Sequence, residues 1–302
     1  MSTNRRASPR AKLPKQFRVL IATDGSDVAW AALSTALKFP LPENVSARAI
    51  AACSDWLGYS PDTYAAVKAS FEEAAAAARK AMARHWPEST VVVVDASPGR
   101  AILAEAAQFK ADVVVVGWRG HGTFRRLLAG SVSRHVAEHA QCSVLVVREA
   151  PSSVRRFVVG FDGSANAERA VDLICRLEPK RGCNLLVVNV VGKVMVSSLG
   201  ILPAFVRVRL QGEIKRMNDE RLQEGQAKVD GAVARLQASG WRAEGEVVSG
   251  GDPLAALTKS LHDFRGDVLV LGARATSGIE RALLGSVANG ALNSVPAVLL
   301  VH

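Results

Sequence analysis

The sequence has few cysteines and no long apolar run. Its four cysteines, among 302 residues, form no C-x-x-C pair and no zinc-binding spacing. They indicate neither a disulfide framework nor a zinc site, and buried, reduced thiols are the expected state in a cytoplasmic protein. No apolar run approaches the roughly 20 residues that a membrane-spanning helix needs. We therefore expect a cytoplasmic protein without a membrane span.

The sequence also lacks the common catalytic and nucleotide-binding signatures. Gly192-Lys193 is followed by Val194, so it is no Walker motif, and no G-x-G-x-x-G follows the first predicted strand. No paired carboxylates, Ser-His-Asp set or activated cysteine can be identified. His135 and His139 have a metal-compatible i, i+4 spacing but no third ligand nearby, so no metal site is predicted. We expect no catalytic residue and at most weak ATP hydrolysis.

Charge is concentrated at the N-terminus, in a chain of formal net charge +10. No apolar segment follows these charges, so residues 1–16 are interpreted as a solvated basic tail rather than a secretory signal. Contact with nucleic acid or anionic lipid is the alternative reading of such a tail, and nucleic acid is not the expected partner. The basic residues of the tail are Arg5, Arg6, Arg10, Lys12 and Lys15.

One glycine-rich stretch stands out after the apolar run 113–116. It consists of Gly117-Trp118-Arg119-Gly120, nine residues, and Gly130-Ser131, and a helix is predicted to follow. Glycine lets a backbone approach an anion closely, and the N–H groups at a helix start favour negative charge. The stretch returns as Gly272-Ala273-Arg274-Ala275, nine residues, and Gly285-Ser286. The sequence therefore predicts two phosphate cradles.

The whole chain is a tandem repeat. Residues 21–26 match 159–164 at an offset of 138, and residues 112–117 match 267–272 at an offset of 155. The difference places an insertion of about 17 residues in the second half. We expect a first domain over 17–150 and a second over 151–302, with the insertion near 192–210 and a long charged helix over 207–239.

Each half alternates predicted strands and helices. In the first half we expect strands near 17–23, 46–53, 90–95, 112–117 and 143–148, and helices near 26–38, 61–86, 99–110 and 131–140. Continuous β-branched apolar strands are typical of parallel sheets covered on both faces. The pattern predicts an α/β fold of two tandem doubly wound domains, each with a five-stranded parallel sheet and helices on both faces.

In such sheets ligands bind beyond the carboxyl ends of the strands, where the strand order reverses. Asp24 follows the first predicted strand and Gly117 ends the fourth, so both would face one crevice if these strands are neighbours. Asp162 and Gly272 have the same relation in the second half. Turn and helix-capping roles are the alternative for both aspartates, because Asp-Gly-Ser precedes a predicted helix.

The pattern G-x2-G-x9-G-[ST], with an aspartate after the first strand, resembles the ATP-binding branch of the universal stress protein family. The resemblance covers nearly the whole chain and implies a cytoplasmic ATP-binding protein of stress adaptation. It also implies that 144–147 and 298–301 are pairing edges, so the two domains would form an intramolecular pseudo-dimer and a further homo-dimer could follow. MgATP and an unknown protein partner are the expected ligands.

The resemblance implies a set of nucleotide-binding positions in both halves. In the first half they are Ala22, Thr23, Asp24, Ala52, Gly117, Gly120, His121, Gly130, Ser131, Val132 and Ser133. In the second half they are Gly160, Phe161, Asp162, Val190, Gly272, Gly285, Ser286 and Val287. The second half departs from the pattern, because Ala275 replaces the second glycine and adds a Cβ to the cradle.

Three functions stay open at this point. The leading one is a regulatory protein whose nucleotide occupancy changes its surface for a partner. A slow ATPase or adenylyl-transfer enzyme is the second, since phosphoryl chemistry can depend on positioning and electrostatics. A scaffold with a degenerate second site is the third. The apolar segment 195–206 is either interdomain core or a lid or contact surface beside the second site.

Overall fold

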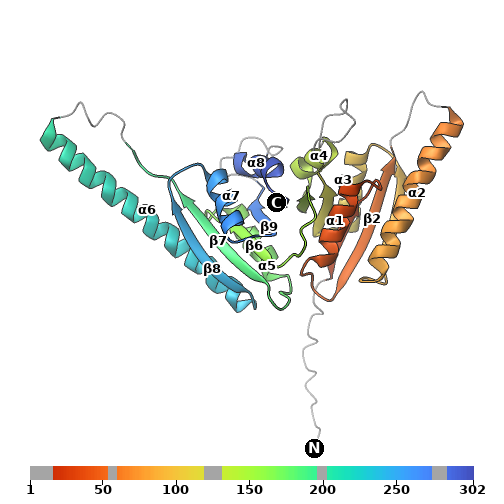
Figure 1. The fold of residues 1–302 in the computed structure, drawn as a ribbon, viewed down its shortest axis with the longest axis horizontal. Helices are drawn as coiled ribbons and strands as arrows, with labels where there is room; N and C mark the ends of the chain where they lie inside the picture. The colour runs from red at the N-terminus through yellow and green to blue at the C-terminus, as the bar shows by residue number, and fades with distance from the viewer. Residues whose placement is uncertain (1–15, 54–59, 119–130, 196–202, 274–283) are drawn as a thin grey trace, which may run out of the picture.

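The first half of the chain alternates strands and helices, as predicted (Figure 1). The computed structural model describes residues 16–53, 60–118, 131–195, 203–273 and 284–302. The strands are β1 (Phe17–Ala22), β2 (Val45–Cys53), β3 (Thr90–Asp95), β4 (Val113–Gly117) and β5 (Ser143–Val147). The helices are α1 (Asp27–Lys38), α2 (Pro61–Ala83), α3 (Pro98–Phe109) and α4 (Ser131–His139). Their bounds lie within a few residues of the predicted ranges.

The second half repeats this order with one longer helix. Its strands are β6 (Arg156–Gly160), β7 (Asn184–Val191), β8 (Arg242–Ser249), β9 (Val268–Gly272) and β10 (Ala297–Val301). Its helices are α5 (Ala165–Cys175), α6 (Ala204–Ala238), α7 (Pro253–Asp263) and α8 (Ser286–Ser294). Helix α6 has 35 residues where α2 has 23, so much of the extra length of the second half is helical.

The ten strands among the described residues form one sheet in the order β3-β2-β1-β4-β5-β10-β9-β6-β7-β8. The five strands within each half are parallel, and the central β5–β10 pair is the antiparallel one among these described strands. The run Val113–Val116 is buried throughout, as expected for a strand covered on both faces. The predicted α/β class and the predicted pairing of the last strands are confirmed.

Apolar cores lie on both faces of this sheet and continue across both halves. One core contains side chains of α1, α2, α5 and α6, among them Leu33, Met82, Ile174 and Leu236. The other contains side chains of α3, α4, α7 and α8, among them Ile102, Val136, Leu257 and Leu292. Within the described residues, no helix combines the length and apolar character needed to cross a bilayer.

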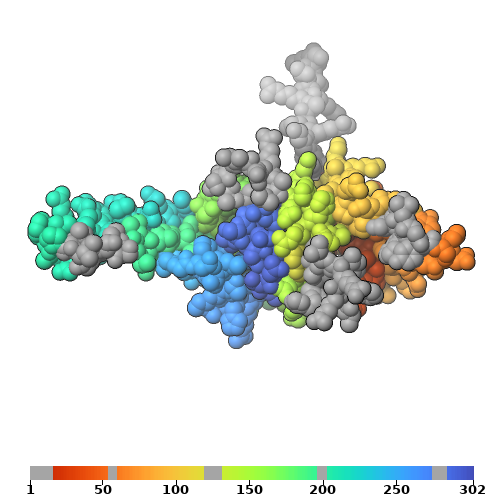
Figure 2. Space-filling view, turned by 90° about the horizontal axis from the view of Figure 1, so that it is seen from above, coloured from red at the N-terminus to blue at the C-terminus, as the bar shows by residue number. Residues whose placement is uncertain are grey.

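The halves also contact each other through side chains. The rings of Phe39 and Phe157 meet edge to face at 5.5 Å between centroids. Arg176 Nη2 donates to Asp112 Oδ1 at 2.8 Å across the junction. The segments that contain α4 and α8 lie side by side at the centre of the molecule, where Arg134 donates to Asn289 (Figures 1 and 2). Burying a residue the size of Phe157 contributes about 1.5–3 kcal/mol, so the junction is a core rather than a hinge.

Candidate functional site

The sheet order creates a strand-order reversal in each half. Strand β1 lies between β2 and β4, with Ile21 opposite Ala49 on one side and Val115 on the other. Helices α1 and α2 cover one face, and α3 and α4 cover the other. The chain therefore leaves β1 and β4 towards opposite faces, and in such sheets ligands bind beyond the carboxyl ends of the strands at this point; we call this region of each half its crevice. The prediction that β1 lies next to β4, and β6 next to β9, is confirmed.

The loop after β1 fixes the orientation of Asp24. Gly25 adopts φ +77°, which L side chains rarely take, and turns the chain into α1. Asp24 Oδ1 accepts hydrogen bonds from Ser26 N at 3.1 Å and from Ser26 Oγ at 2.5 Å. Ser26, in turn, is the N-cap of α1 and accepts from Ala29 N. The cap is therefore the serine, and the aspartate is a turn residue at the edge of the crevice.

The loop after β6 repeats this arrangement. Asp162 Oδ1 accepts from Ser164 N at 2.9 Å, Gly163 has φ +79°, and Ser164 caps α5 by accepting from Ala167 N. The second loop differs by a cation, because Lys228 Nζ lies 3.5 Å from the Asp162 carbonyl oxygen. Both aspartates thus serve the alternative turn role through Oδ1, and this role is compatible with a ligand contact.

Gly117 and Gly272 are required by helix packing. A Cβ on Gly117 would lie 2.6 Å from the Val28 carbonyl oxygen, in the first turn of α1. A Cβ on Gly272 would lie 2.9 Å from the Asn166 carbonyl carbon, in the first turn of α5. These clashes involve backbone, which cannot move aside without shifting the helix. The two strand-end glycines therefore let the first turns of α1 and α5 pack directly on the ends of β4 and β9.

Helices α4 and α8 begin beside the same strand ends. Ser131 and Ser286 are their first residues, and Val132 and Val287 follow in the first turn. The Ser133 hydroxyl is buried and donates to the Gly117 carbonyl, so it joins α4 to the end of β4. The unsatisfied N–H groups at such helix starts attract anions. The described part of each motif therefore supplies an anion-attracting helix start near the crevice.

The strand ends beside the crevices carry mostly small or apolar residues. Ala52 is 7% exposed, and Phe161 is 3% exposed with its ring in the core. Thr23 N donates to Ile50 O at 2.9 Å and Phe161 N to Val188 O at 2.8 Å. These N–H groups are used within the sheet, so a ligand there would meet other backbone groups. Ala22 pairs with Ile50, Gly160 with Val188 and Val190 with Val248.

Part of the predicted site lies outside the described residues. This concerns Gly120, His121 and Gly130 in the first motif, and Ala275, which replaces the second glycine of the second motif, also lies outside them. The structure brings the remaining predicted positions to the carboxyl ends of neighbouring strands or to the helix starts beside them.

Cations that follow β7 or belong to α6 lie beside strand ends of the second half, and the repeat pattern did not predict them. The Lys228 side chain lies over Gly163, and the Lys193 side chain lies over Gly250. Arg221 donates to the Gly192 carbonyl. In the first half Gly25 faces the Ala74 methyl group instead of a lysine. Aligning α6 with α2 by their buried positions would have placed Lys228 opposite Ala74.

His135 and His139 form no metal centre with the other described residues, among which no group of three or more candidate ligands occurs. Their rings stack at 4.3 Å between centroids, and His139 Nδ1 lies 2.9 Å from the His135 carbonyl oxygen. Because a carbonyl only accepts, Nδ1 carries the proton in this contact.

Solved structures share the whole-chain fold. A universal stress protein from Archaeoglobus fulgidus covers 95% of this chain and 98% of its own, with a TM-score of 0.64 at 17% identity. A protein from Pseudomonas aeruginosa described as a putative universal stress protein covers 95% and 93%, with a TM-score of 0.55 at 13% identity. At these identities the likeness shows the fold alone.

Sequence relatives and a family model give the closer assignment. A universal stress protein from Thermus aquaticus is 34% identical over 134 residues, which are 43% of this chain and 97% of that protein. A universal stress protein from Mycobacterium tuberculosis is 32% identical over 143 residues, which are 45% of this chain and about half, 46%, of that protein. The model described as "Universal stress protein family" matches twice, over residues 17–148 and 153–302. With both halves matched, the chain belongs to the universal stress protein family.

Proposed function

We propose that this chain binds MgATP in the crevice beyond β1, β2 and β4, and that occupancy changes the surface offered to a protein partner. The observation that carries the proposal is the repeated geometry of a turn aspartate, a strand-end glycine and a helix start around one strand-order reversal. The helix start attracts phosphate, and a flat base suits the small side chains of Ala22 and Ala52.

The Mg²⁺ arrives with the nucleotide in this proposal. Among the residues that the structure describes, no cluster of three or more metal-ligating side chains exists. Mg²⁺ commonly keeps several waters and is bound through substrate phosphates, so a dedicated protein cage is not required. In this role the ion neutralises phosphate charge while the protein positions the nucleotide.

We further propose that the first crevice binds ATP more tightly than the second. Ala275 adds a methyl group to the second cradle. Lys228 stands at the second crevice where the first has Ala74, and its charge would attract phosphate, so the proposed order of affinities rests on the Ala275 methyl group. The partner would therefore respond mainly to nucleotide bound in the first crevice.

A pair of matched variants tests the site in the full chain. Gly130→Val should remove tight ATP binding, since a branched side chain blocks the phosphate, whereas Gly285→Val at the equivalent position should leave it. Isothermal titration calorimetry measures the affinity, and circular dichroism checks that both variants are folded. Unchanged ATP affinity in a folded Gly130→Val variant would reject the site.

A further inference from the structure

Strand β3 is an edge of the sheet with no charge along its length before Asp95. It pairs with β2 on one side and with no other described strand on its second side. Its sequence between Thr90 and Asp95 is four valines, each partly exposed. Edge strands usually carry charges, glycines or covering elements that prevent pairing with another chain. The opposite edge, β8, has such features, in the form of Arg242, Glu244, Gly245 and Glu246.

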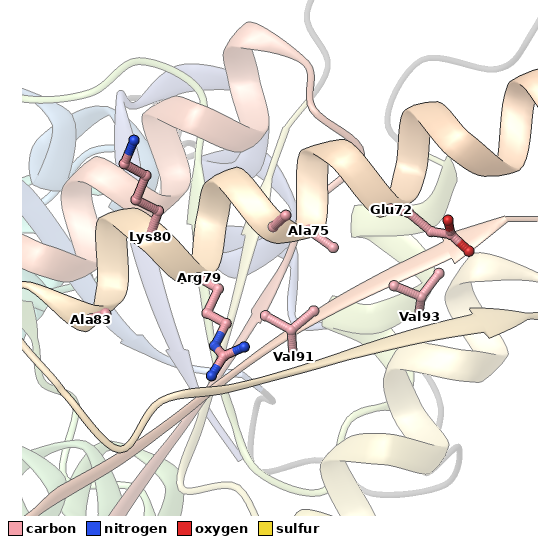
Figure 3. A pocket seen from close by; sticks show the side chains of 8 residues that line it. Glu72, Ala75, Arg79, Lys80, Ala83, Val91 and Val93 are labelled. Carbon is pink, nitrogen blue, oxygen red and sulfur yellow. The ribbon is translucent and has the colours of Figure 1, made fainter.

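An apolar groove of about 410 Å³ runs between this edge and helix α2 (Figure 3). Val91 and Val93 of β3 and Ala75 of α2 form its apolar wall. Glu72 lies near the Val93 end and Arg79 near the Val91 end (Figure 3). The full lining consists of Glu72, Ala75, Ala76, Arg79, Lys80, Ala83, Val91 and Val93. The groove is thus acidic at one end and basic at the other.

The equivalent position at the other edge is closed by packing. In β8, Gly245 lies opposite Val187 of β7, as Val91 lies opposite Ala49 of β2. A Cβ on Gly245 would lie 2.2 Å from Val229 Cγ1, so α6 lies directly on β8. At the β3 edge the large residue is on the strand and the small one, Ala75, on the helix. The β3 edge therefore differs from its own internal repeat in both charge and cover.

We infer that β3 pairs antiparallel with β3 of a second copy of this chain, about a two-fold axis at Val92. In this register Val91 of one copy lies opposite Val93 of the other. The same axis passes between Ala75 and Ala76 of α2, and it brings Glu72 of each copy to Arg79 of the other. A two-fold interface must be self-complementary, and the acid-to-base order along this groove meets that condition.

The dimensions of paired strands agree with contact between the helices. Neighbouring strands lie about 4.8 Å apart and α2 packs on both β2 and β3, so the two α2 helices would lie about 10 Å apart or somewhat more on the same face. Helices pack at about 8–10 Å, and the closer distances need small side chains. Ala76 and Ala83 supply these on the exposed stripe of α2 that borders the groove. The strand pair and the helix pair can therefore form together.

A second copy fits this surface better than a foreign peptide does. A peptide strand would satisfy the backbone edge of β3. A second copy also presents Arg79 to Glu72 and Glu72 to Arg79, and a peptide strand has no such pair of charges on a helix beside it. The interface uses neither crevice and continues the sheet of each copy at the end farthest from the β5–β10 junction.

Charge exchange on α2 tests the proposal in the full chain. Sedimentation velocity over about 1–100 µM protein gives the dimer dissociation constant. Glu72→Arg and Arg79→Glu should each raise it about tenfold or more, because like charges then meet twice across the axis. The double variant restores the opposite charges and should return the constant close to the wild-type value. Glu244→Arg, on the β8 edge, is the matched control and should leave it unchanged.

Hydrogen exchange locates the interface independently of these variants. Amides of β3 should exchange more slowly as protein concentration rises, while those of β8 should not change. A wild-type chain that stays monomeric over the whole range overturns the proposal. So does a dimer that both single variants form as tightly as the wild type, or a dimer whose β3 amides are not protected.

Discussion

At the scale of single residues, the strand-end glycines have a packing reason that spacing alone does not reveal. Gly117 and Gly272 end their strands where a helix start touches the backbone, with would-be Cβ contacts under 3.0 Å to α1 and α5. Their spacing in the sequence predicted that both are phosphate-cradle residues. Helix contact and ligand approach both call for glycine, so a sequence pattern cannot separate the two demands.

The packing reason predicts a loss of stability in Gly117→Ala. The new methyl group meets Val28 backbone, so the free energy of unfolding should fall by about 1–3 kcal/mol, as overpacking usually does. Gly231→Ala is a suitable control, because no atom lies within 4 Å of a Cβ at this helical position. It should raise stability by about 0.5–1 kcal/mol. Equal stability of the two variants in urea titrations would contradict the packing account.

Cys142 makes a prediction about pH. Burial, with a smaller contribution from the Asp112 carboxylate, raises the pKa of its thiol from 9.0 to about 11. As pH rises from 9 to 11 the unfolded chain releases this proton and the folded chain retains it, so stability falls through this window. Cys142→Ala should therefore lose stability less steeply than wild type, by on the order of 1 kcal/mol at the upper end. Identical slopes in urea titrations at several pH values would show that the thiol is not protected.

At the scale of elements, the insertion is expressed mainly as a longer helix. The repeat offsets indicated extra residues near 192–210 and a charged helix from 207, and the helix begins at Ala204. Buried positions of α6 lie only in its C-terminal part, from Gly225 onwards. Met195 and Phe205, at the borders of the segment whose role was left open, are 83% and 78% exposed. Figure 1 shows the first half of α6 extending away from the sheet.

The exposure of this part of α6 can be tested by hydrogen exchange. Amides in 204–214 should exchange faster than those in 225–236, because only the latter stretch is held by core contacts such as Val229 and Leu236. Under the lid interpretation, adding ATP should slow exchange at the N-terminal end of α6. Strong protection of 204–214 in dilute, nucleotide-free protein would instead identify the segment as core.

The elements themselves were largely predictable, and their relative placement was less so. Continuous β-branched runs indicated the strands, and Asp-Gly-Ser indicated a turn before a helix at 24–26 and 162–164, where the structure shows that the serine is the cap. The position of Lys228 over the second crevice was not predicted. It depends on how α6 rotates over β7 and β8, and this rotation follows from its buried face rather than from the repeat offsets used for the strands.

At the scale of the whole molecule, the two halves form one sheet with two shared cores. The antiparallel pairing of Val144 to Val147 with 297–300 removes the edge that each half would otherwise expose. Both crevices open beyond the carboxyl ends of their own strands, so they are separated by the junction. The tandem arrangement thus gives one chain two similar crevices whose surrounding side chains differ.

In the proposed function the first crevice binds ATP and recognises adenine mainly through backbone groups. Isothermal titration calorimetry of the full chain with MgATP and with MgGTP tests it most directly. We predict saturable ATP binding with clearly weaker GTP binding, because the guanine edge reverses the donor and acceptor that backbone groups at the strand ends would meet. Absence of ATP binding, or equal affinity for the two nucleotides, would contradict this account.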